Sequence, residues 1–429
     1  MKRITTLLTA VLLACTLLNA QQYDVLDQLK ADIRKSYGME GPHRLDESGP
    51  ICPAPSGYKP FYISHYGRHG SRYAWNSDTY LLLHQVFSKA SQLGVLTPYG
   101  KEFAARYEAF WMEPWINSGD LVPLGFDQHL ALGEFVYTSF PQVFKGRKRV
   151  DALSSTSQRA IVSMSAFNLG LKSCNPKLTI RLRSDHTGMT VAAPQSAHKS
   201  LVRHFKGEND RPEGWETQEE FFVRTTNYQP ILDRLFTDCS FFSEFQGGAL
   251  YFLRELWQLL SGYHNYEPRP LFDDLLTQEE RLKLWESDNY FSFRGDITAR
   301  YKEIPLLQDI MEKAESAFDD PNEAANLRFV HDYILDALIT LINVNGCGTI
   351  PATPEEVKYW FRNFDVPMAA TLLFVFYKNK QGDILFKPVL NEKDAFLPQL
   401  TPVSGNFYRW GDFRAWADDL FREHPQIQE

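Results

Sequence analysis

A strand-to-helix junction at residues 61–72 constrains the fold most strongly. The apolar run 61–63 predicts a buried strand, and the two glycines that follow indicate a tight turn before a helical pattern. Arg68, His69 and Arg72 then lie at the carboxyl end of a strand. Ligands bind at this edge of open α/β sheets because the loops there converge on a crevice. The chain is therefore expected to form an α/β sheet with a site at this turn.

The side chains of this junction suit an anion that contains phosphorus. Arg68 and Arg72 place two planar guanidiniums within five residues, and such groups bind phosphate oxygens in fixed geometry. His69, between them, can attack a phosphorus atom as a nucleophile. The alternative is a solvated loop whose arginines pair with surface carboxylates.

A second junction follows a short strand predicted at Val150 to Leu153. A turn rich in Ser and Thr comes next, and it favours the start of a helix from about Gln158 to Gly170. Arg159 lies in the first turn of that helix, where a cation is unfavourable without a compensating anion. A bound phosphate or a nearby carboxylate would each provide this anion.

A third junction follows the strand predicted at residues 326–330. His331 and Asp332 come next and precede an apolar helical run from Tyr333 to Ile342. A carboxylic acid at this position can protonate a leaving alkoxide, and the histidine can donate a hydrogen bond to phosphate. The alternative is an Asp that only caps the helix, beside an incidental histidine.

Composition restricts the partners of the chain. The 429 residues include 45 Lys and Arg against 53 Asp and Glu, for a net charge of −8, and there is no long basic block. A nucleic-acid partner is therefore not expected, and no protein partner is evident. The 44% hydrophobic content is sufficient for one large domain or two of moderate size. The chain contains no H-E-x-x-H, P-loop or G-x-S-x-G motif.

The first 20 residues have the features of a secretory signal peptide. Two basic residues precede an apolar stretch, and small Ala20 stands before polar residues, which favours cleavage after Ala20. No second apolar run approaches the length of a membrane span. The mature protein is expected to be exported, either periplasmic or secreted. Lipidation at Cys15, within a sequence that resembles a bacterial lipoprotein box, is the alternative.

The mature chain keeps four cysteines, at positions 52, 174, 239 and 347. An even number in an exported chain predicts two disulfides, with three possible pairings among Cys52, Cys174, Cys239 and Cys347. Buried free thiols are the alternative. No pair has the C-x-x-C spacing of a zinc or redox site.

The pattern along the chain predicts an α/β domain interrupted by a helical insertion. The α/β domain is expected to comprise residues 21–170 and 325–429, and the mainly α-helical domain residues 171–324. Predicted helices include residues 79–93, 99–111, 217–236, 241–260 and 278–286, with another from Pro123. Residues 374–386 are predicted to form a hairpin.

Together the three junctions resemble the histidine acid phosphatases, which form clade 2 of the histidine phosphatase superfamily. The sequence Arg68-His69-Gly70-Ser71-Arg72 matches the family signature R-H-G-x-R-x-P, with Ala74 where Pro is usual. Arg159 matches the third arginine of the family, and His331-Asp332 its H-D motif. The resemblance is greatest to multiple inositol polyphosphate phosphatases and phytases, although the animal-type subgroup usually has H-A-E at the last motif.

This resemblance implies a histidine phosphatase-like central sheet flanked by helices, with an inserted α-helical domain. It also implies that His69 is the nucleophile and Asp332 the proton donor. Arg68, Arg72, Arg159 and His331 would bind the phosphate, without a metal or another cofactor. The clustered cations should keep His69 deprotonated in acid.

The activity implied is hydrolysis of a small-molecule phosphate ester through a phosphohistidine, with inositol polyphosphates such as phytate as the expected substrates. A broad-specificity or sugar-phosphate acid phosphatase is the alternative substrate class. A pseudophosphatase would use the same residues to bind phosphoesters without turnover. A transferase that resembles phosphoglycerate mutase would also contain an Arg-His-Gly sequence, but the signal peptide and His331-Asp332 favour an exported hydrolase.

Overall fold

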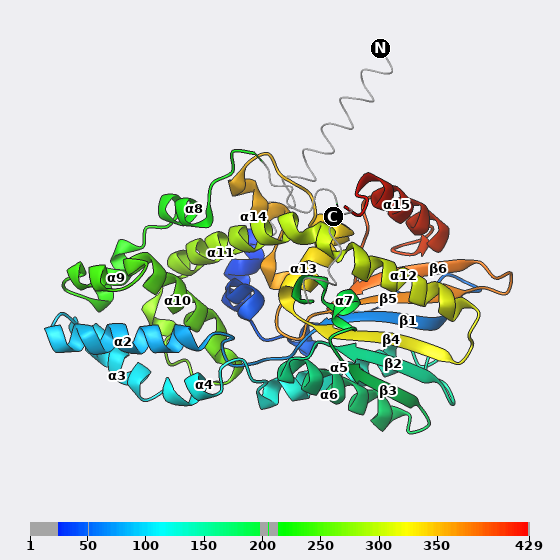
Figure 1. Ribbon diagram of the computed structural model, residues 1–429, viewed down its shortest axis with the longest axis horizontal. Coiled ribbons are helices and arrows are strands. Elements are labelled where there is room, and N and C mark those ends of the chain that lie inside the picture. The colour runs from blue at the N-terminus through cyan, green and yellow to red at the C-terminus, as the bar shows by residue number, and fades with distance from the viewer. Residues whose placement is uncertain (1–24, 50, 198–204, 206–212, 428–429) are drawn as a thin grey trace, which may run out of the picture.

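The structure is a computed structural model that describes residues 25–49, 51–197, 205 and 213–427. Its centre is an eight-stranded sheet in the order β3-β2-β4-β1-β5-β6-β7, with β8 paired to β6 (Figure 1). The strands are β1 (Lys59–Arg68), β2 (Arg149–Ser154), β3 (Thr179–Ser184), β4 (Glu323–Val330), β5 (Thr371–Lys378), β6 (Ile384–Leu390), β7 (Lys393–Asp394) and β8 (Tyr408–Arg409).

Strands β3, β2, β4 and β1 run parallel, and β5 and β6 continue the sheet antiparallel. Helices cover the central strands on both faces, so β4 is buried throughout and β1 is buried from Tyr62 onward. This burial explains the continuous apolar pattern of the first junction. Because β2, β4 and β1 are parallel neighbours, their carboxyl ends lie side by side at one edge.

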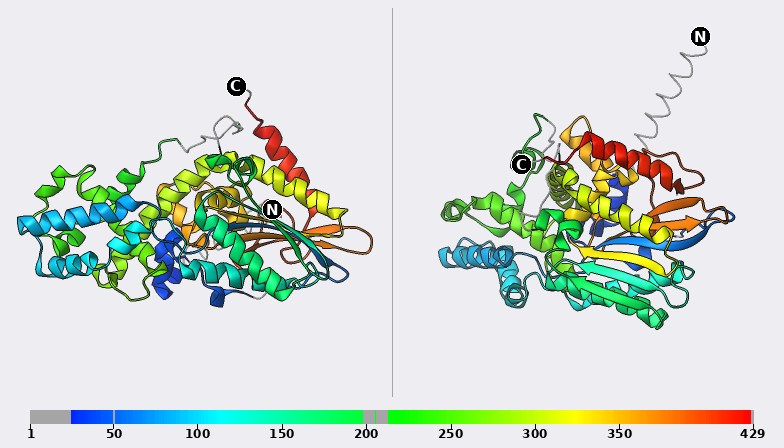
Figure 2. Two further views of the ribbon diagram at one scale, coloured as in Figure 1. Left: turned by 60° about the horizontal axis from the view of Figure 1, so that its bottom comes forward. Right: turned by 45° about the vertical axis from the view of Figure 1, so that its right-hand side comes forward.

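Two layers of helices enclose the sheet (Figures 1 and 2). Helices α5 (Pro123–Ser139) and α6 (Gln158–Cys174) pack on one face, in a core shared with Val150 and Leu327. The opposite core combines Tyr62 and Phe376 with side chains of several helices, of which three pack along the sheet. These are α12 (Ile304–Phe318), α13 (Asp332–Leu341) and α15 (Trp410–Glu423). Neighbouring residues of β1 thus belong to opposite cores, as a pleated strand requires.

A helical lobe extends beyond one end of the sheet and has its own aromatic-rich core (Figure 1). Phe87, Phe103, Phe236 and Phe252 meet there. Further α-helices are α2 (Ser77–Leu93), α3 (Pro98–Glu108), α4 (Met112–Ile116), α7 (Met189–Ala192), α8 (Gln218–Thr225), α9 (Gln229–Leu235), α10 (Gly248–Gly262), α11 (Gln278–Ala299) and α14 (Val357–Trp360).

The range 171–324 contains α7 to α12, but it also contains β3, which extends the sheet beside β2. The helical lobe also includes α2 and α3, which precede residue 171 in the chain and pack with α10. The division of the chain at residues 170 and 324 remains a proposal.

Two predicted helices are interrupted. The helix predicted over 217–236 is divided into α8 and α9, with Pro230 in the first turn of α9, where its missing N–H costs nothing. The helix predicted over 241–260 begins only at Gly248, because Gly247 and Gly248 have φ values of 75° and 59°. Both residues thus adopt the left-handed region, which glycine enters without a steric cost.

The four cysteines have free thiols, so the predicted disulfides are not formed in this structure. The physical reason is their separation in the fold. Cys347 is buried in the core that holds α13, whereas Cys239 packs against the core of the helical lobe. Cys52 is exposed beside Asp394, and Cys174 ends α6.

The predicted signal peptide, residues 1–20, lies outside the described residues, as does Cys15. Among the helices that are described, none combines the length and the apolar character needed to cross a membrane.

Candidate active site

The three junctions meet at the carboxyl edge of β1, β4 and β2. The main chain keeps its strand pairing just beyond each strand end, since His69 N donates to Val330 O at 3.0 Å and Ser155 N donates to Phe329 O at 3.0 Å. This pairing brings the rings of His69 and His331 to a centroid distance of 5.5 Å. Residues far apart in the chain thus form one site.

His69 is buried and has a defined tautomer. Its Nδ1 lies 2.9 Å from Gly70 O, and a carbonyl oxygen can only accept, so Nδ1 carries the proton. Nε2 is therefore the atom with a free lone pair. Burial, followed by the charges of Arg159, Arg68 and Arg72, holds the pKa of His69 well below its usual range. The imidazole is consequently neutral in mild acid.

The loop that carries His69 packs tightly on the start of α5. A Cβ atom on Gly70 would lie 2.4 Å from Gly125 O, so no larger residue fits without displacing the main chain. Gly70 N donates to Ser163 Oγ at 3.0 Å, and Ser71 N donates to Gln128 Oε1 at 2.9 Å. Side chains of α5 and α6 thus fix the position of the loop.

Arg68 is fully buried, and both terminal nitrogens of its guanidinium group are held. Nη1 donates to Val366 O at 2.9 Å and also to Met39 O. Nη2 donates to Asp332 Oδ2, so the first junction is linked directly to the third. These contacts orient the guanidinium before any ligand binds.

Arg72 and Arg159 complete the cluster of arginines. Arg72 donates to Tyr73 O at 3.0 Å and to Glu40 Oε1 at 3.1 Å. Arg159 donates to Gly119 O at 3.4 Å, and it forms no ion pair with any residue that the structure describes. Burial and the neighbouring Arg72 lower the pKa of Arg159 to about 10. No carboxylate among the described residues therefore provides the compensating anion that the position of Arg159 requires.

Each of these three arginines has a buried Nε without a hydrogen-bond partner in the described part of the chain, as does His331 at Nδ1. A buried charged donor without a partner is costly. Three such guanidiniums around one histidine favour an anion with several oxygens.

His331 and Asp332 occupy the N-cap and the first turn of α13. His331 Nε2 lies 3.1 Å from Ser155 Oγ, and burial together with Arg159 lowers its pKa to about 4. Burial by itself would raise the pKa of Asp332, but Arg68 and Arg72 outweigh this effect and lower it to about 2. In the unliganded site Asp332 is therefore a carboxylate.

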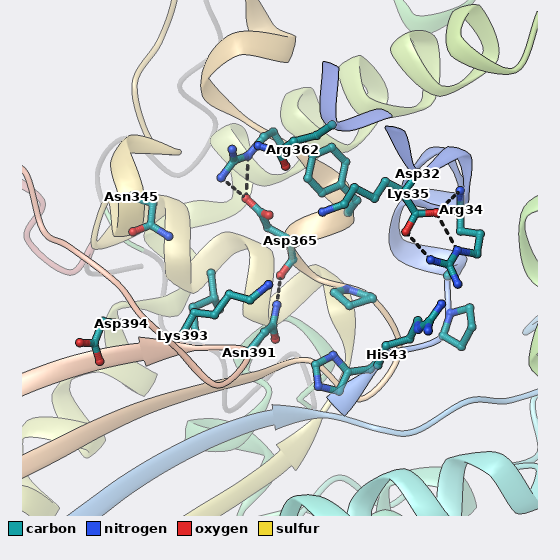
Figure 3. A pocket seen from close by; sticks show the side chains of 18 of the residues that line it. Asp32, Arg34, Lys35, His43, Asn345, Arg362, Asp365, Asn391, Lys393 and Asp394 are labelled. Atoms are coloured by element: carbon teal, nitrogen blue, oxygen red, sulfur yellow. Dashed lines mark hydrogen bonds and ion pairs between the residues drawn. The ribbon is translucent and has the colours of Figure 1, made fainter. Parts of the chain in front are cut away.

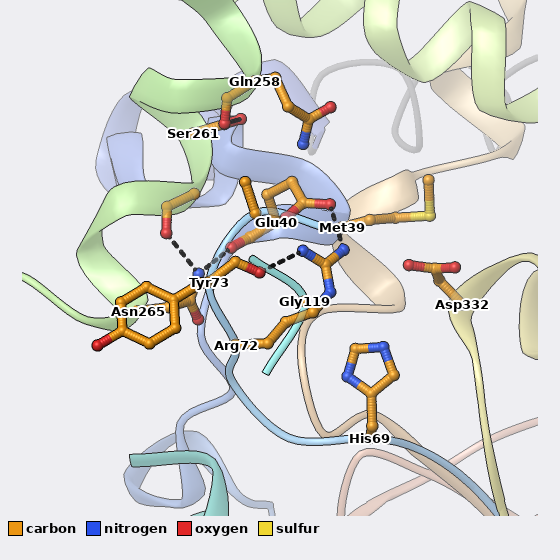
Figure 4. A network of polar contacts seen from close by, with 12 residues as sticks. Met39, Glu40, His69, Arg72, Tyr73, Gly119, Gln258, Ser261, Asn265 and Asp332 are labelled. Carbon is orange, nitrogen blue, oxygen red and sulfur yellow. Dashed lines mark hydrogen bonds and ion pairs between the residues drawn. The ribbon is translucent and has the colours of Figure 1, made fainter. Parts of the chain in front are cut away.

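Glu40 is a site residue that the sequence does not indicate. Its carboxylate contacts Arg72 and lies 4.0 Å from Arg68 Nη2. Its main-chain oxygen accepts from Asn265 Nδ2 at 2.7 Å, which connects the site to the helical lobe (Figure 4). Glu40 stands just before a loop region rich in Gly and Pro with no periodic pattern, so only the fold reveals its role. Ser155 and Gln128 likewise give no sequence signal for their contacts.

His129 of α5 is fully buried, and its ring contacts Phe329. No group of three or more His, Cys, Asp or Glu side chains within the described residues is arranged to hold a metal ion.

Comparison with known proteins agrees with this geometry. Residues 67–233 match the family model of the histidine phosphatase superfamily (branch 2). That segment contains Arg68, His69, Arg72 and Arg159, whereas His331 and Asp332 lie outside it. No curated protein sequence matches the chain significantly.

Solved structures share the fold at low identity. The multiple inositol polyphosphate phosphatase of Bifidobacterium longum, in complex with inositol hexasulfate, superposes with a TM-score of 0.70 at 15% identity, over 89% of this chain and 97% of the other. The phytase from D. castellii superposes with a TM-score of 0.66 at 13% identity, over 91% of this chain and 85% of the other. The Hafnia alvei phytase in complex with tartrate superposes with a TM-score of 0.55 at 15% identity, over 85% of this chain and 98% of the other.

Residues 67–233 thus carry the pattern of the histidine phosphatase superfamily (branch 2), and the chain shares its fold with the phosphatases named above. The resemblance predicted from the three junctions is thereby confirmed, and with it the enzyme class, a histidine-type phosphomonoester hydrolase.

Proposed function

We propose that this protein is an exported phosphatase that hydrolyses small phosphate monoesters through a phosphohistidine at His69. The observation that supports this most strongly is a neutral, buried His69 surrounded by three arginines that retain unpaired donors. A nucleophile with its lone pair on Nε2 and a cluster of cations for phosphate oxygens are the two requirements of attack at phosphorus.

In the first step, His69 Nε2 forms a bond to phosphorus while the bond from phosphorus to the ester oxygen breaks. The proton stays on Nδ1 and remains hydrogen-bonded to Gly70 O, so the imidazole keeps its orientation as charge develops. Arg68, Arg72, Arg159 and His331 stabilise the oxygens of the transferring phosphoryl group.

Asp332 supplies a proton to the leaving oxygen. Its pKa of about 2 belongs to the unliganded site, where Arg68 and Arg72 face no substrate. A phosphate anion bound to the same arginines opposes their charge and raises the pKa of Asp332, so the carboxyl group can take up a proton as substrate binds. In the second step, Asp332 accepts a proton from water as the water oxygen bonds to phosphorus and the bond from phosphorus to nitrogen breaks.

The proposed substrates are inositol polyphosphates such as phytate. The support comes from structural neighbours, one of which is a multiple inositol polyphosphate phosphatase in complex with inositol hexasulfate, while two others are phytases. Sugar phosphates, or a broad range of esters, are the alternative substrates. Export rests on the signal-peptide pattern of residues 1–20.

The test is phosphate release from inositol hexakisphosphate, glucose 1-phosphate and 4-nitrophenyl phosphate, measured for the wild type and for His69→Ala. We expect His69→Ala to lower kcat/KM by a factor on the order of a thousand or more, because the nucleophile is lost. His84→Ala, in the helical lobe, is the matched control and should retain activity. The wild type should have its highest kcat/KM on inositol hexakisphosphate.

Equal kcat/KM on all three esters would overturn the inositol polyphosphate preference but not the mechanism. A wild type that binds inositol hexakisphosphate without releasing phosphate would identify a pseudophosphatase. Transfer of the phosphoryl group to a second hydroxyl, in place of release, would identify a mutase-like transferase.

A further inference from the structure

A cavity of about 610 Å³ lies outside the catalytic site (Figure 3). Gly38, Gly41 and His43 line it, whereas Met39 and Glu40, between them in the chain, face Arg68 and Arg72. One segment therefore forms a wall of both sites. None of the residues proposed for catalysis lines this cavity. Its volume is within the range of pockets that bind small molecules.

The lining is basic although the chain as a whole is acidic. It includes five Lys or Arg residues and three Asp residues. Each Asp is already neutralised by a cation: Asp32 by Arg34, Asp365 by Arg362 and Asp394 by Lys387. The lining thus has a surplus of positive charge.

Arg44 pairs with Asp46 outside the lining, so Lys35 and Lys393 provide that surplus. They reach toward the middle of the cavity from opposite sides (Figure 3). Neither ammonium group forms an ion pair with a described residue, and the partner found for Lys35 is the ring of Phe364, at 5.3 Å. Two ammonium groups facing one cavity repel each other, and an anion between them removes the repulsion.

Unusual backbone conformations gather around this cavity. The described residues include five non-glycine residues with positive φ, at positions 343, 345, 369, 391 and 392. Asn345 and Asn391 line the cavity, and the other three lie within two residues of a lining residue. Left-handed backbone at non-glycine residues persists only where surrounding contacts enforce it, and it concentrates at ligand sites.

Glu392 shows what enforces this conformation. Its φ is 57°, its side chain is buried, and Oε2 lies 2.6 Å from Nε2 of His43. Thr371 Oγ1 donates to Glu392 Oε1 at 3.2 Å. The main-chain oxygen of His43 accepts from Gln128 Nε2 at 3.2 Å, and Gln128 also holds Ser71 in the loop of His69. The wall of the cavity is therefore rigid and connected to the catalytic loop.

We propose that this cavity is a second binding site, which takes a small polyanion that carries several phosphate groups and is held by Lys35 and Lys393. Binding in this cavity does not depend on catalysis at His69. The two sites share a wall, but none of the side chains proposed for the reaction lines the cavity.

The test is calorimetric titration of the full chain with myo-inositol hexasulfate, which carries sulfate in place of phosphate. We expect two ligands per wild-type chain. The variant Lys35→Gln/Lys393→Gln should weaken one of the two binding events by at least about tenfold, since two charged donors are lost. Arg159→Ala should weaken the other event instead. Lys101→Gln/Lys313→Gln, at two exposed lysines, is the matched control and should leave both events unchanged.

Hydrolysis of 4-nitrophenyl phosphate by Lys35→Gln/Lys393→Gln, within about twofold of the wild type, would show that this variant is folded. A wild type that binds one ligand, or a pocket variant that binds two with unchanged affinity, would overturn the second site. If the wild type shows two separable binding events but releases no phosphate, the second site is supported and the proposed catalytic function is wrong.

Discussion

At the scale of single residues, the charge state of His69 is set by its neighbours. Burial and three guanidiniums disfavour the imidazolium form, so this histidine stays neutral at pH values where an exposed one would be protonated. Arg159 is the largest of the charge contributions to this pKa. It thus has two proposed roles: it binds phosphate, and it keeps the nucleophile available in acid.

We therefore predict that Arg159→Ala changes the pH dependence as well as the rate. Loss of the guanidinium raises the pKa of His69, so protonation of the nucleophile begins at a higher pH as the solution is acidified. In a kcat/KM profile with 4-nitrophenyl phosphate from pH 3 to 8, the acid limb should move to higher pH. Arg409→Ala, at an exposed arginine of β8, should reproduce the wild-type profile. A profile that falls in height but keeps its shape would contradict this role.

At the scale of elements, the contact of α5 with α6 positions two of the three junctions. α5 supplies Gln128 to the loop of His69, and α6 carries Arg159 and Ser163. The two helices approach closely because glycine stands at their crossing. A Cβ atom on Gly133 would lie 2.1 Å from Phe167 O, and one on Gly170 would lie 2.2 Å from Leu130 O. These close approaches are to main-chain atoms, which cannot move aside as the end of a flexible side chain can.

Gly133→Ala should accordingly destabilise the protein although alanine is the better helix former. We expect the free energy of unfolding to fall by about 1–3 kcal/mol, the usual cost of overpacking. Gly411→Ala, at an exposed position of α15 with open space around it, is the control and should be neutral or slightly stabilising. Chemical denaturation at neutral pH measures both. Equal stability of the two variants would mean that the helices can separate at little cost.

At the scale of the whole molecule, buried histidines in the core should lower the stability of the fold in acid, although the site keeps His69 neutral there. His65 and His129 are fully buried on the face covered by α5 and α6, and burial is the main cause that lowers the pKa of each to about 3. In the unfolded chain both have ordinary pKa values near about 6.5. Below that pH the unfolded chain binds protons that the folded chain does not.

The free energy of unfolding should therefore fall as the pH drops below about 6.5, by about 1.4 kcal/mol per pH unit for each such histidine, until the folded pKa is reached. Between about pH 6.5 and pH 5 this amounts to about 2 kcal/mol each. Urea unfolding at several pH values should show the slope. His129→Gln should make it shallower, whereas His84→Gln, in the helical lobe, should change it much less. An unchanged slope in His129→Gln would show that this histidine is protonated in the folded state.

The sequence by itself determined the local parts of this protein. Apolar runs followed by glycine or by N-cap residues predict β1, β2 and β4 and the starts of α6 and α13, because strand burial and helix capping depend on near neighbours. The same reasoning identified Arg68, His69, Arg72, Arg159, His331 and Asp332 as candidates, and the structure places all six at one edge of the sheet. Their catalytic roles remain proposals.

Only the tertiary structure decided what these parts contact. The order β2-β4-β1 makes the three junctions neighbours, and no local pattern specifies strand order. Glu40 reaches Arg72 from a distant segment, β3 joins the sheet from a range predicted to be helical, and the four cysteines lie in different parts of the fold and do not pair. The second cavity likewise exists because lining residues such as His43, Asp365 and Lys393 pack together. Contacts between residues distant in the chain depend on the packing of the whole core, which short-range sequence patterns do not encode.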